Sequence, residues 1–278
     1  MGAQQIARSS RARGMKSLTA ATFFAAVILS IGQAADPWLA RISPQTPGPF
    51  PLVRPFSGKF RFGWSEIGAA TAEARVWYSG DKIMVEVKGG TNGVARTLWQ
   101  LDARHKATIL KEGLQPLAFE QVERYAKKRV RTEAVFRPDG LWRLRAVTSD
   151  PKNVPRWKKI KVEPIRDIVS AMLFIRSQPL NDGEKVGVVA FPGDAPFLVE
   201  ATVVRHEQIR VGNQLRKAIK LNFQIQRIDV AKRRLAPHGK FKNGIVWISD
   251  DENRVPLRAE VNIFIGYVFG ELENIQFL

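Results

Sequence analysis

Apolar and polar residues alternate along most of this chain from Phe56 onward, and this alternation predicts β-strands. The pattern is clear in 219–226, where Ile219, Leu221, Phe223 and Ile225 alternate with Lys220, Asn222, Gln224 and Gln226. Such a strand buries one face and exposes the other. The same reasoning predicts strands at 58–64, 94–101, 117–125, 186–191, 197–205, 215–227, 243–249 and 255–265.

Two hairpins can be placed in register from the sequence. In 73–88, a two-residue turn at Gly80-Asp81 gives one wholly apolar face and one face with two opposite-charge pairs. The predicted pairs are Tyr78–Ile83, Val76–Val85, Ala74–Val87, Trp77–Met84, Arg75–Glu86 and Glu73–Lys88. In 130–148, a three-residue loop at 138–140 predicts the pairs Phe136–Trp142, Ala134–Leu144, Thr132–Ala146 and Glu133–Arg145.

One segment, 165–177, has helical apolar spacing, with Pro164 in the first turn and Pro179 beyond the end. Its Asp167 and Ser170 lie one turn apart, which indicates a contact at the helix N-terminus. The expected fold class is therefore all-β with one or two helices. We expect a large, curved, mostly antiparallel sheet, an open or half-barrel wrapped around a helix.

The N-terminus predicts export. Four cations (Arg8, Arg11, Arg13 and Lys16) precede an uncharged apolar core from Leu18 to Gly32 and the small residues Ala34 and Ala35. This order is typical of a secretory signal peptide, and the core is shorter than the roughly 20 residues of a spanning helix. We expect a signal peptide over 1–34, cleaved near Ala34 or Ala35, with Met15 as an alternative start and an uncleaved anchor as the alternative reading. The predicted location is the periplasm.

Domain organisation follows from the remaining sequence. Residues 35–55 hold six prolines with little periodicity, which indicates a stiff, extended leader. Residues 56–278 then form one β-rich domain. The chain has no cysteine, so disulfides and thiol chemistry are excluded.

The net charge is +18, and about +14 is left once the four cations of the signal peptide are removed. A basic exported protein favours anionic partners such as an anionic membrane surface. Scattered, solvated charges are the alternative interpretation. Export argues against nucleic acid as a partner.

Catalytic motifs are sparse. None of the three histidines, His105, His206 and His238, has a partner at metal-ligand spacing, so no metal and no cofactor is expected. The acidic run Asp250-Asp251-Glu252 lies between two predicted strands, where turn residues are expected, and it lacks the spacing of a calcium loop.

Aromatic and basic residues are the stronger candidates. Tryptophans in or beside predicted strands either fill the core or present a concave face to an apolar ligand: Trp64, Trp77, Trp99, Trp142 and Trp247. Trp77 falls on the polar face of its hairpin, which predicts that both faces are partly covered. The segment Arg156, Trp157, Lys158, Lys159 and Lys161 is either a solvated loop or a contact to an anionic surface.

Two stretches, 167–184 and 246–272, resemble the C-terminal signature of the bacterial exported family known as domain of unknown function 3108. The matching positions include Asp167, Ser170, Arg176, Asp250, Asp251 and Arg254. The resemblance implies an exported β-rich domain and no established reaction. By analogy of fold, large curved sheets around a helix are similar to periplasmic lipoprotein carriers and envelope-stress sensors.

The leading hypothesis is a non-enzymatic protein of the cell envelope that binds an apolar or amphipathic, lipid-like ligand on a curved sheet. A scaffold or assembly factor that binds another envelope protein through a strand edge is the first alternative. The second is a hydrolase acting on a glycan or ester through Asp250, Asp251 and His206.

Overall fold

Strand pairing organises the chain in the computed structural model, which describes residues 36–278 except 66, 149–151, 153, 238–242 and 263–265. The predicted signal peptide over 1–34 lies outside the described residues. The strands are β1 (Phe56–Trp64), β2 (Ile67–Ser79), β3 (Lys82–Thr91), β4 (Leu101–Leu110), β5 (Pro116–Tyr125), β6 (Arg129–Arg137), β7 (Gly140–Val147), β8 (Lys158–Ile160), β9 (Arg166–Asp167), β10 (Lys185–Phe191), β11 (Phe197–Val211), β12 (Gln214–Asp229), β13 (Arg234–Pro237), β14 (Asn243–Ser249), β15 (Pro256–Asn262) and β16 (Tyr267–Phe277).

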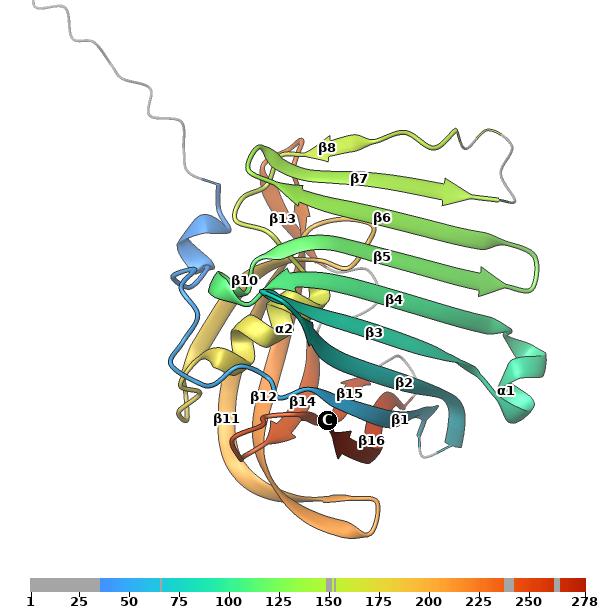
Figure 1. Cartoon of the computed structure of the whole chain (residues 1–278), viewed down its shortest axis with the longest axis vertical. Helices are drawn as coiled ribbons and strands as arrows, with labels where there is room; N and C mark the ends of the chain where they lie inside the picture. The colour runs from blue at the N-terminus through green and yellow to red at the C-terminus, as the bar shows by residue number, and fades with distance from the viewer. Residues whose placement is uncertain (1–35, 66, 149–151, 153, 238–242, 263–265) are drawn as a thin grey trace, which may run out of the picture. The chain divides into compact units, whose positions relative to one another are not determined.

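All the strands belong to one sheet, in the order β8-β7-β6-β5-β4-β3-β2-β1-β16-β15-β14-β12-β11-β10-β9, with β13 beside β12. The first half, β1–β8, and the second half, β9–β16, are meanders joined where β1 pairs with β16. The pairs are antiparallel except for β9 with β10. The sheet does not close into a barrel, and the expected fold class is confirmed (Figure 1).

Helix α2 (Ile168–Ser177) lies between the two halves (Figure 1). Leu173 and Val169 pack with the core of β2–β7, which includes Ile83, Ile109 and Leu141. The opposite side of the helix packs on β10–β14, through residues such as Phe174 and Ile175. We call the face of each half that meets α2 the inner face. A helix with apolar residues on all sides requires such cover.

Both ends of α2 are stabilised by polar contacts. At the N-terminus, Asp167 Oδ1 accepts hydrogen bonds from the backbone N–H groups of Val169 (2.8 Å) and Ser170 (3.2 Å), so the predicted contact between Asp167 and Ser170 is confirmed. At the C-terminus, Gly48 N–H donates to Ser177 Oγ (3.0 Å) and Phe50 N–H to the Ser177 carbonyl (3.1 Å). The helix begins later than predicted, because 166–167 pair with β10 before the Asp167 cap.

The proline-rich segment is packed against the domain. It has one 3-10 turn (Leu39–Arg41), buries Trp38, and places Arg41 against Glu200 of β11. Ser43 N–H donates to the Gly187 carbonyl of β10 (2.9 Å). Residues 35–278 accordingly form one compact unit.

The first hairpin has the predicted register in every pair, from Tyr78–Ile83 to Glu73–Lys88. The second hairpin was predicted wrongly. Gly140, with a φ of +122°, pairs with Arg137 across a two-residue turn, so Trp142 lies opposite Val135 instead of Phe136. Likewise Ala134 meets Arg143, Thr132 meets Arg145 and Glu133 meets Leu144. Trp142 therefore moves to the outer face of the sheet.

The predicted strand at 94–101 is also wrong. Residues 93–98 form helix α1 (Gly93–Leu98), a connection between β3 and β4, and a second 3-10 turn (Glu112–Leu114) connects β4 to β5. Val94 and Leu98 are 77% and 83% exposed, so these apolar side chains are not part of the core. The other predicted strands fall on observed strands, except that 263–265 of the predicted strand at 255–265 lie outside the described residues. Strands β11 and β12 extend beyond the predicted bounds.

A buried ion cluster joins β16 to its neighbours on the outer face. Glu271 is 2% exposed and contacts Arg61 (2.9 Å) and Arg258 (2.7 Å). The Gly212 N–H, from the turn between β11 and β12, also donates to Glu271 (3.2 Å). Burial by itself raises the pKa of Glu271, but the hydrogen bonds from Arg61 and Gly212 and the two arginine charges outweigh burial, so the pKa is lowered.

We predict that Glu271→Gln lowers the free energy of unfolding by about 3 kcal/mol at pH 7, because two arginines lose a buried anionic partner. Since the pKa of Glu271 is lowered, its contribution is present above about pH 4.3 and is lost as the pH falls through the folded value. Urea titration of both proteins measures the difference. Glu73→Gln, at an exposed carboxylate 3.7 Å from Lys59, is the control and should cost less than about 1 kcal/mol. Equal losses in both variants would contradict the prediction.

Candidate functional site

The inner face of β1–β4 extends beyond the region that α2 covers. A ten-residue helix is about 15 Å long, whereas a ten-residue strand such as β4 is about 33 Å long. The core of buried residues on these strands ends near Val76, Val85 and Ala107. Farther along, the same face holds half-buried alanines and glycines. This part of the inner face is the candidate site.

Small side chains form the floor of a shallow groove there, which we call the trough. Its floor consists of small and apolar side chains from three adjacent strands: Ala70, Ala72, Val87, Gly89 and Ala103. Phe62, Trp99 and Leu101 border it, and its volume is about 240 Å³. Pockets for small molecules usually measure about 300–1,000 Å³, so the trough suits part of an alkyl chain.

Close backbone packing explains two of the glycines. A Cβ on Gly89 would lie 2.6 Å from the Cβ of Ala72. A Cβ on Gly270 of β16 would lie 2.7 Å from the ring of Phe62. Larger residues at these positions would push β2 and β3, or Phe62 and β16, apart. The glycines therefore keep the floor smooth and the Phe62 ring against the sheet.

One end of the trough is polar. His105 lines it, and the Nε2 atom of His105 is buried and has no hydrogen-bond partner among the described residues. Burial lowers the pKa of His105, and the charge of Glu123 opposes this. The imidazole is therefore neutral at pH 7.

Strand β5 presents a polar row beside the trough, in register with β4. Gln121, Glu123 and Tyr125 pair with His105, Ala103 and Leu101, respectively. Glu123 accepts hydrogen bonds from Gln121 Nε2 (2.7 Å) and Tyr125 OH (2.9 Å). Burial and this contact with Glu123 raise the pKa of Tyr125 to about 12. An apolar floor next to a hydrogen-bonding row matches an amphipathic ligand.

The structure places the predicted tryptophans apart from one another. Trp99, at the end of α1, is 57% exposed and lines the trough. Trp64, at the end of β1, pairs with Val268 and is 43% exposed. Trp247 is 7% exposed and donates from Nε1 to Glu207 (2.7 Å).

The other two tryptophans lie on the outer face of the first half. Trp77 is half-buried there, with the Arg75 guanidinium 5.5 Å from its ring. Trp142 donates from Nε1 to Asp139 (3.1 Å). Sequence reasoning missed the alanines, glycines and His105 of the trough, because small residues give a weak signal until the strands are paired.

Asp167 and Ser170 of the family motif lie at the N-terminus of α2, and the other motif residues lie around its C-terminus. Arg254 donates to the carbonyls of Arg176 (2.7 Å) and Pro179 (2.8 Å), and also to that of Gln178. Arg176 in turn donates to the carbonyls of Pro51 (2.8 Å) and Asn253 (3.0 Å). The two guanidinium groups lie 3.4 Å and 5.6 Å from the ring of Phe50. Together these contacts join the leader, the helix and the turn between β14 and β15.

In the same region, hydrogen bonds within the turn between β14 and β15 stabilise the acidic residues of that turn. Asp251 Oδ1 accepts from Ser249 Oγ (2.8 Å), Asn253 N–H (2.8 Å) and Arg254 N–H (3.1 Å). His206 contacts Asp250 through Nδ1 (2.9 Å) and the Leu180 carbonyl through Nε2 (3.1 Å). Asp250 and His206 do meet, as the hydrolase hypothesis requires, but both ring nitrogens are occupied. The hydrogen bond to Asp250 raises the pKa of His206, partly opposed by burial.

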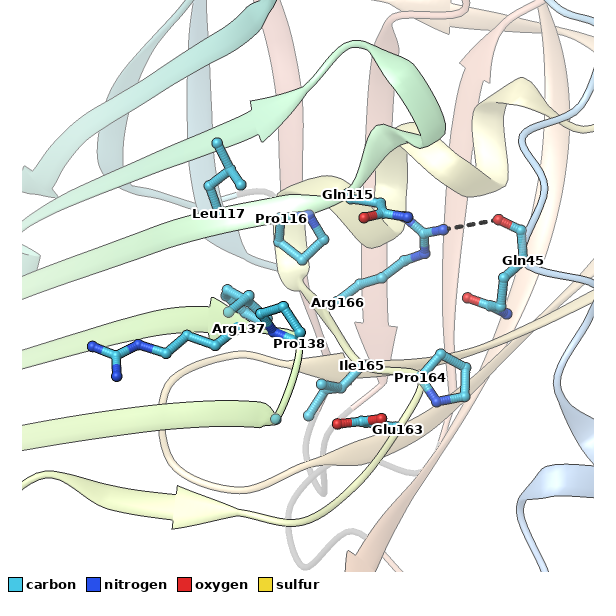
Figure 2. Close-up of a pocket in the computed structure, with 12 residues that line it drawn as sticks. Gln45, Gln115, Pro116, Leu117, Arg137, Pro138, Glu163, Pro164, Ile165 and Arg166 are labelled. Carbon is cyan, nitrogen blue, oxygen red and sulfur yellow. Dashed lines mark hydrogen bonds between the residues drawn. The ribbon is translucent and has the colours of Figure 1, made fainter.

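A cleft of about 780 Å³ lies at the link between β8 and β9 (Figure 2). Arg166 crosses it and donates to the carbonyls of Leu114 (2.6 Å) and Gln45 (3.2 Å), while Arg137 points away from it (Figure 2). Burial lowers the pKa of Arg166 to about 10, although the charge of Asp167 opposes this. Both Nη atoms of Arg166 donate to backbone carbonyls, so this side chain connects β9 with the leader and with the turn between β4 and β5.

The predicted basic contact divides into two parts. Arg156 and Trp157 are exposed ahead of β8. Lys158, Lys159 and Lys161 line a separate groove between β8 and β13. Among the described residues, no group of three or more His, Asp or Glu side chains is placed to hold a metal ion. Nor does any helix in the described part of the chain have the length and apolarity needed to span a membrane.

We predict that Arg254→Lys lowers the free energy of unfolding by about 3 kcal/mol, because the single nitrogen of lysine lacks the planar fork with which Nη1 and Nη2 of Arg254 reach three carbonyls at a buried helix end. Urea titration measures the loss. Arg75→Lys, at an exposed position on β2, is the matched control and should change stability by less than about 0.5 kcal/mol. A loss below about 1 kcal/mol for Arg254→Lys would contradict the structural role of this residue.

We predict a pH-dependent effect for Asp250→Asn. The contact with Asp250 raises the pKa of His206 in the folded protein. The contact therefore stabilises the fold fully below about pH 6.5, and this stabilisation disappears as the pH rises through the pKa of His206 in the folded protein. The variant should therefore be less stable than the parent at pH 5.5 and nearly equal to it at pH 8.5. Urea midpoints at the two pH values measure this, and a pH-independent difference would refute it.

Comparison with known proteins agrees with this fold. No curated protein matches the sequence. Among solved structures, a beta-barrel-like protein of domain of unknown function DUF1849 from Brucella abortus has a TM-score of 0.50 and 9% identity, covering 82% of this chain and 99% of that one. A structure described as a "putative lipoprotein" from Parabacteroides distasonis has a TM-score of 0.35 and 9% identity, covering 83% and 99%.

The sequence itself carries a family signature. Residues 58–273 match the family described as "Protein of unknown function (DUF3108)", and the match covers both meanders of the sheet. The motif positions at Asp167, Ser170, Arg176, Asp250, Asp251 and Arg254 lie within it. The chain therefore belongs to the DUF3108 family.

Proposed function

We propose that this protein is an exported, non-enzymatic binding protein of the cell envelope, and that its trough holds the apolar part of an amphipathic, lipid-like molecule. One observation carries the proposal. The inner face of β1–β4 beyond α2 is apolar and bears small residues, and it is bordered by the exposed side chains of Phe62 (38%) and Trp99 (57%). Large exposed aromatic groups around an apolar groove favour ligand binding.

The polar row of β5 supports the amphipathic character of the ligand. With an alkyl chain over Ala70, Ala72 and Ala103, a head group would lie near the hydroxyl of Tyr125, because Tyr125 pairs with Leu101 at the border of the trough. A purely apolar ligand would make no use of this polar row.

Strand addition by a protein partner is less favoured. The terminal strands of the sheet, β8 and β9, have three and two residues, and β8 carries two lysines. Short, lysine-bearing strands are how natural proteins protect sheet edges from pairing. A hydrolase is less favoured as well, because His206 is held on both sides and Asp251 is used by its own turn.

Mass spectrometry of an organic extract of the protein, purified from its native envelope without detergent, tests the proposal. We expect a stoichiometric amphipathic molecule with an alkyl chain. An extract without such a molecule, together with no binding of added dodecanoate, would refute the proposal.

We predict that Ala103→Trp lowers the affinity for dodecanoate by roughly tenfold or more, because the indole fills the trough and each displaced methylene costs about 0.8 kcal/mol. Isothermal titration calorimetry measures the affinity. Ala146→Trp, on the outer face of β7, is the control and should bind like the parent. Equal weakening by both substitutions would count against the trough as the site.

A further inference from the structure

A second groove lies between the free side of β8, in the first half of the sheet, and β12 with β13, in the second half. Its volume is about 730 Å³. The first half contributes Arg143, Lys158, Lys159 and Lys161, and the second half contributes Arg227 and Arg234. The groove has no residue in common with the trough.

Cations outnumber acids in this groove. Asp194 and Asp229 are its acidic lining residues among those described. Asp229 contacts Arg234 (3.8 Å), and Lys159 contacts Asp139, outside the groove, at 2.9 Å. Within the described part of the chain, Lys158, Lys161 and Arg227 have no carboxylate within 4.0 Å. The groove therefore holds uncompensated positive charge.

Strand register shows that Arg143, Lys158 and Arg227 face the same space. Lys158 pairs with Arg143, and both belong to the inner side of their strands, because Leu141 and Ile160 two residues away are inner-face residues in the core. Arg227 pairs with Phe197, which packs on the inner face of the second half. Like charges thus face each other across the open seam of the sheet, and an anion between them would relieve their repulsion.

Arg143 is the most restricted of these cations. Its Nη1 donates to the Asp194 carbonyl (2.7 Å), and its buried Nε has no partner among the described residues. Burial, together with the charge of Arg145, lowers the pKa of Arg143. Buried apolar side chains, Ala195 and Ile228, lie beneath the groove. Because these apolar side chains exclude water, the charges of the groove are screened less by solvent.

We propose that this groove binds a phosphoryl group, with Arg143, Lys158, Lys161 and Arg227 as its ligands. A compact anion with several oxygens can contact cations from both halves at once, and guanidinium and ammonium groups are the usual protein ligands of phosphate. An acidic peptide fits less well, because β8 offers a three-residue edge for main-chain pairing. The phosphoryl group belongs either to a free phosphorylated solute or to a phospholipid head group.

Two probes separate these sources: inorganic pyrophosphate, and vesicles of phosphatidylglycerol compared with phosphatidylcholine. The test variant is Lys158→Glu/Lys161→Glu/Arg227→Glu. The control is Lys127→Glu/Lys185→Glu/Lys217→Glu, which makes the same change in net charge at exposed lysines outside the groove. Circular dichroism and thermal unfolding establish that both variants are folded.

We expect the parent protein to bind at least one probe, and the groove variant to bind it about tenfold more weakly, with the control within about twofold of the parent. Loss of pyrophosphate binding assigns a free phosphorylated ligand, whereas loss of binding to phosphatidylglycerol vesicles alone assigns a lipid head group. The proposal is overturned if the parent binds neither probe, if the control loses as much affinity as the groove variant, or if an oligoglutamate peptide binds more tightly than both probes. Ala103→Trp should leave this binding unchanged, so the two sites can fail independently.

Discussion

The structure depends on burying one short, apolar helix inside a single sheet. Each large apolar side chain of α2 is stabilised by about 1.5–3 kcal/mol when it is removed from water. Leu173 and Val169 belong to the core cluster that contains the buried residues of β2–β7, and Phe174 and Ile175 belong to a separate cluster with β10–β14. Covering both sides of the helix therefore needs both halves of the sheet, which curves around α2 (Figure 1).

Burial of the helix also explains the family motif. The last carbonyls of a helix have no partner within it and are usually hydrated. Here Arg254 takes the place of water and donates hydrogen bonds to the carbonyls of Arg176, Gln178 and Pro179. The leader donates a further hydrogen bond to the carbonyl of Ser177. Asp167 caps the other end. Residues that resemble catalytic candidates in the sequence thus maintain a helix end, and the two proposed binding surfaces lie elsewhere.

Sequence reasoning succeeded where the information is local. The 73–88 register followed from the alternation of charges and apolar residues around Gly80. It failed at 94–101, where exposed Val94 and Leu98 imitated a strand, and at Gly140, which pairs within the strand and so shifts its hairpin by one residue.

The proposed binding surfaces need contacts that the local pattern does not give. Ala72 and Gly89 continue the predicted 73–88 hairpin by one pair, but Ala103 lies on β4, which the predicted strand at 94–101 misplaced. The basic groove needs Lys158 and Arg227 from opposite halves of the sheet, and their proximity is not visible in the order of residues along the chain. Of the predicted ligand contacts, Trp99 lies at the trough, and three lysines of the predicted basic segment line the groove.

The most direct measurement of the central claim, that the part of the inner face not covered by α2 holds an alkyl chain, is nuclear magnetic resonance of alanine methyl groups during titration with dodecanoate. The account predicts intermolecular nuclear Overhauser effects from the alkyl chain to the methyl groups of Ala70, Ala72 and Ala103, and none to Ala146 on the outer face. Effects confined to Ala146, or the absence of any effect at the trough alanines with saturating dodecanoate, would contradict it.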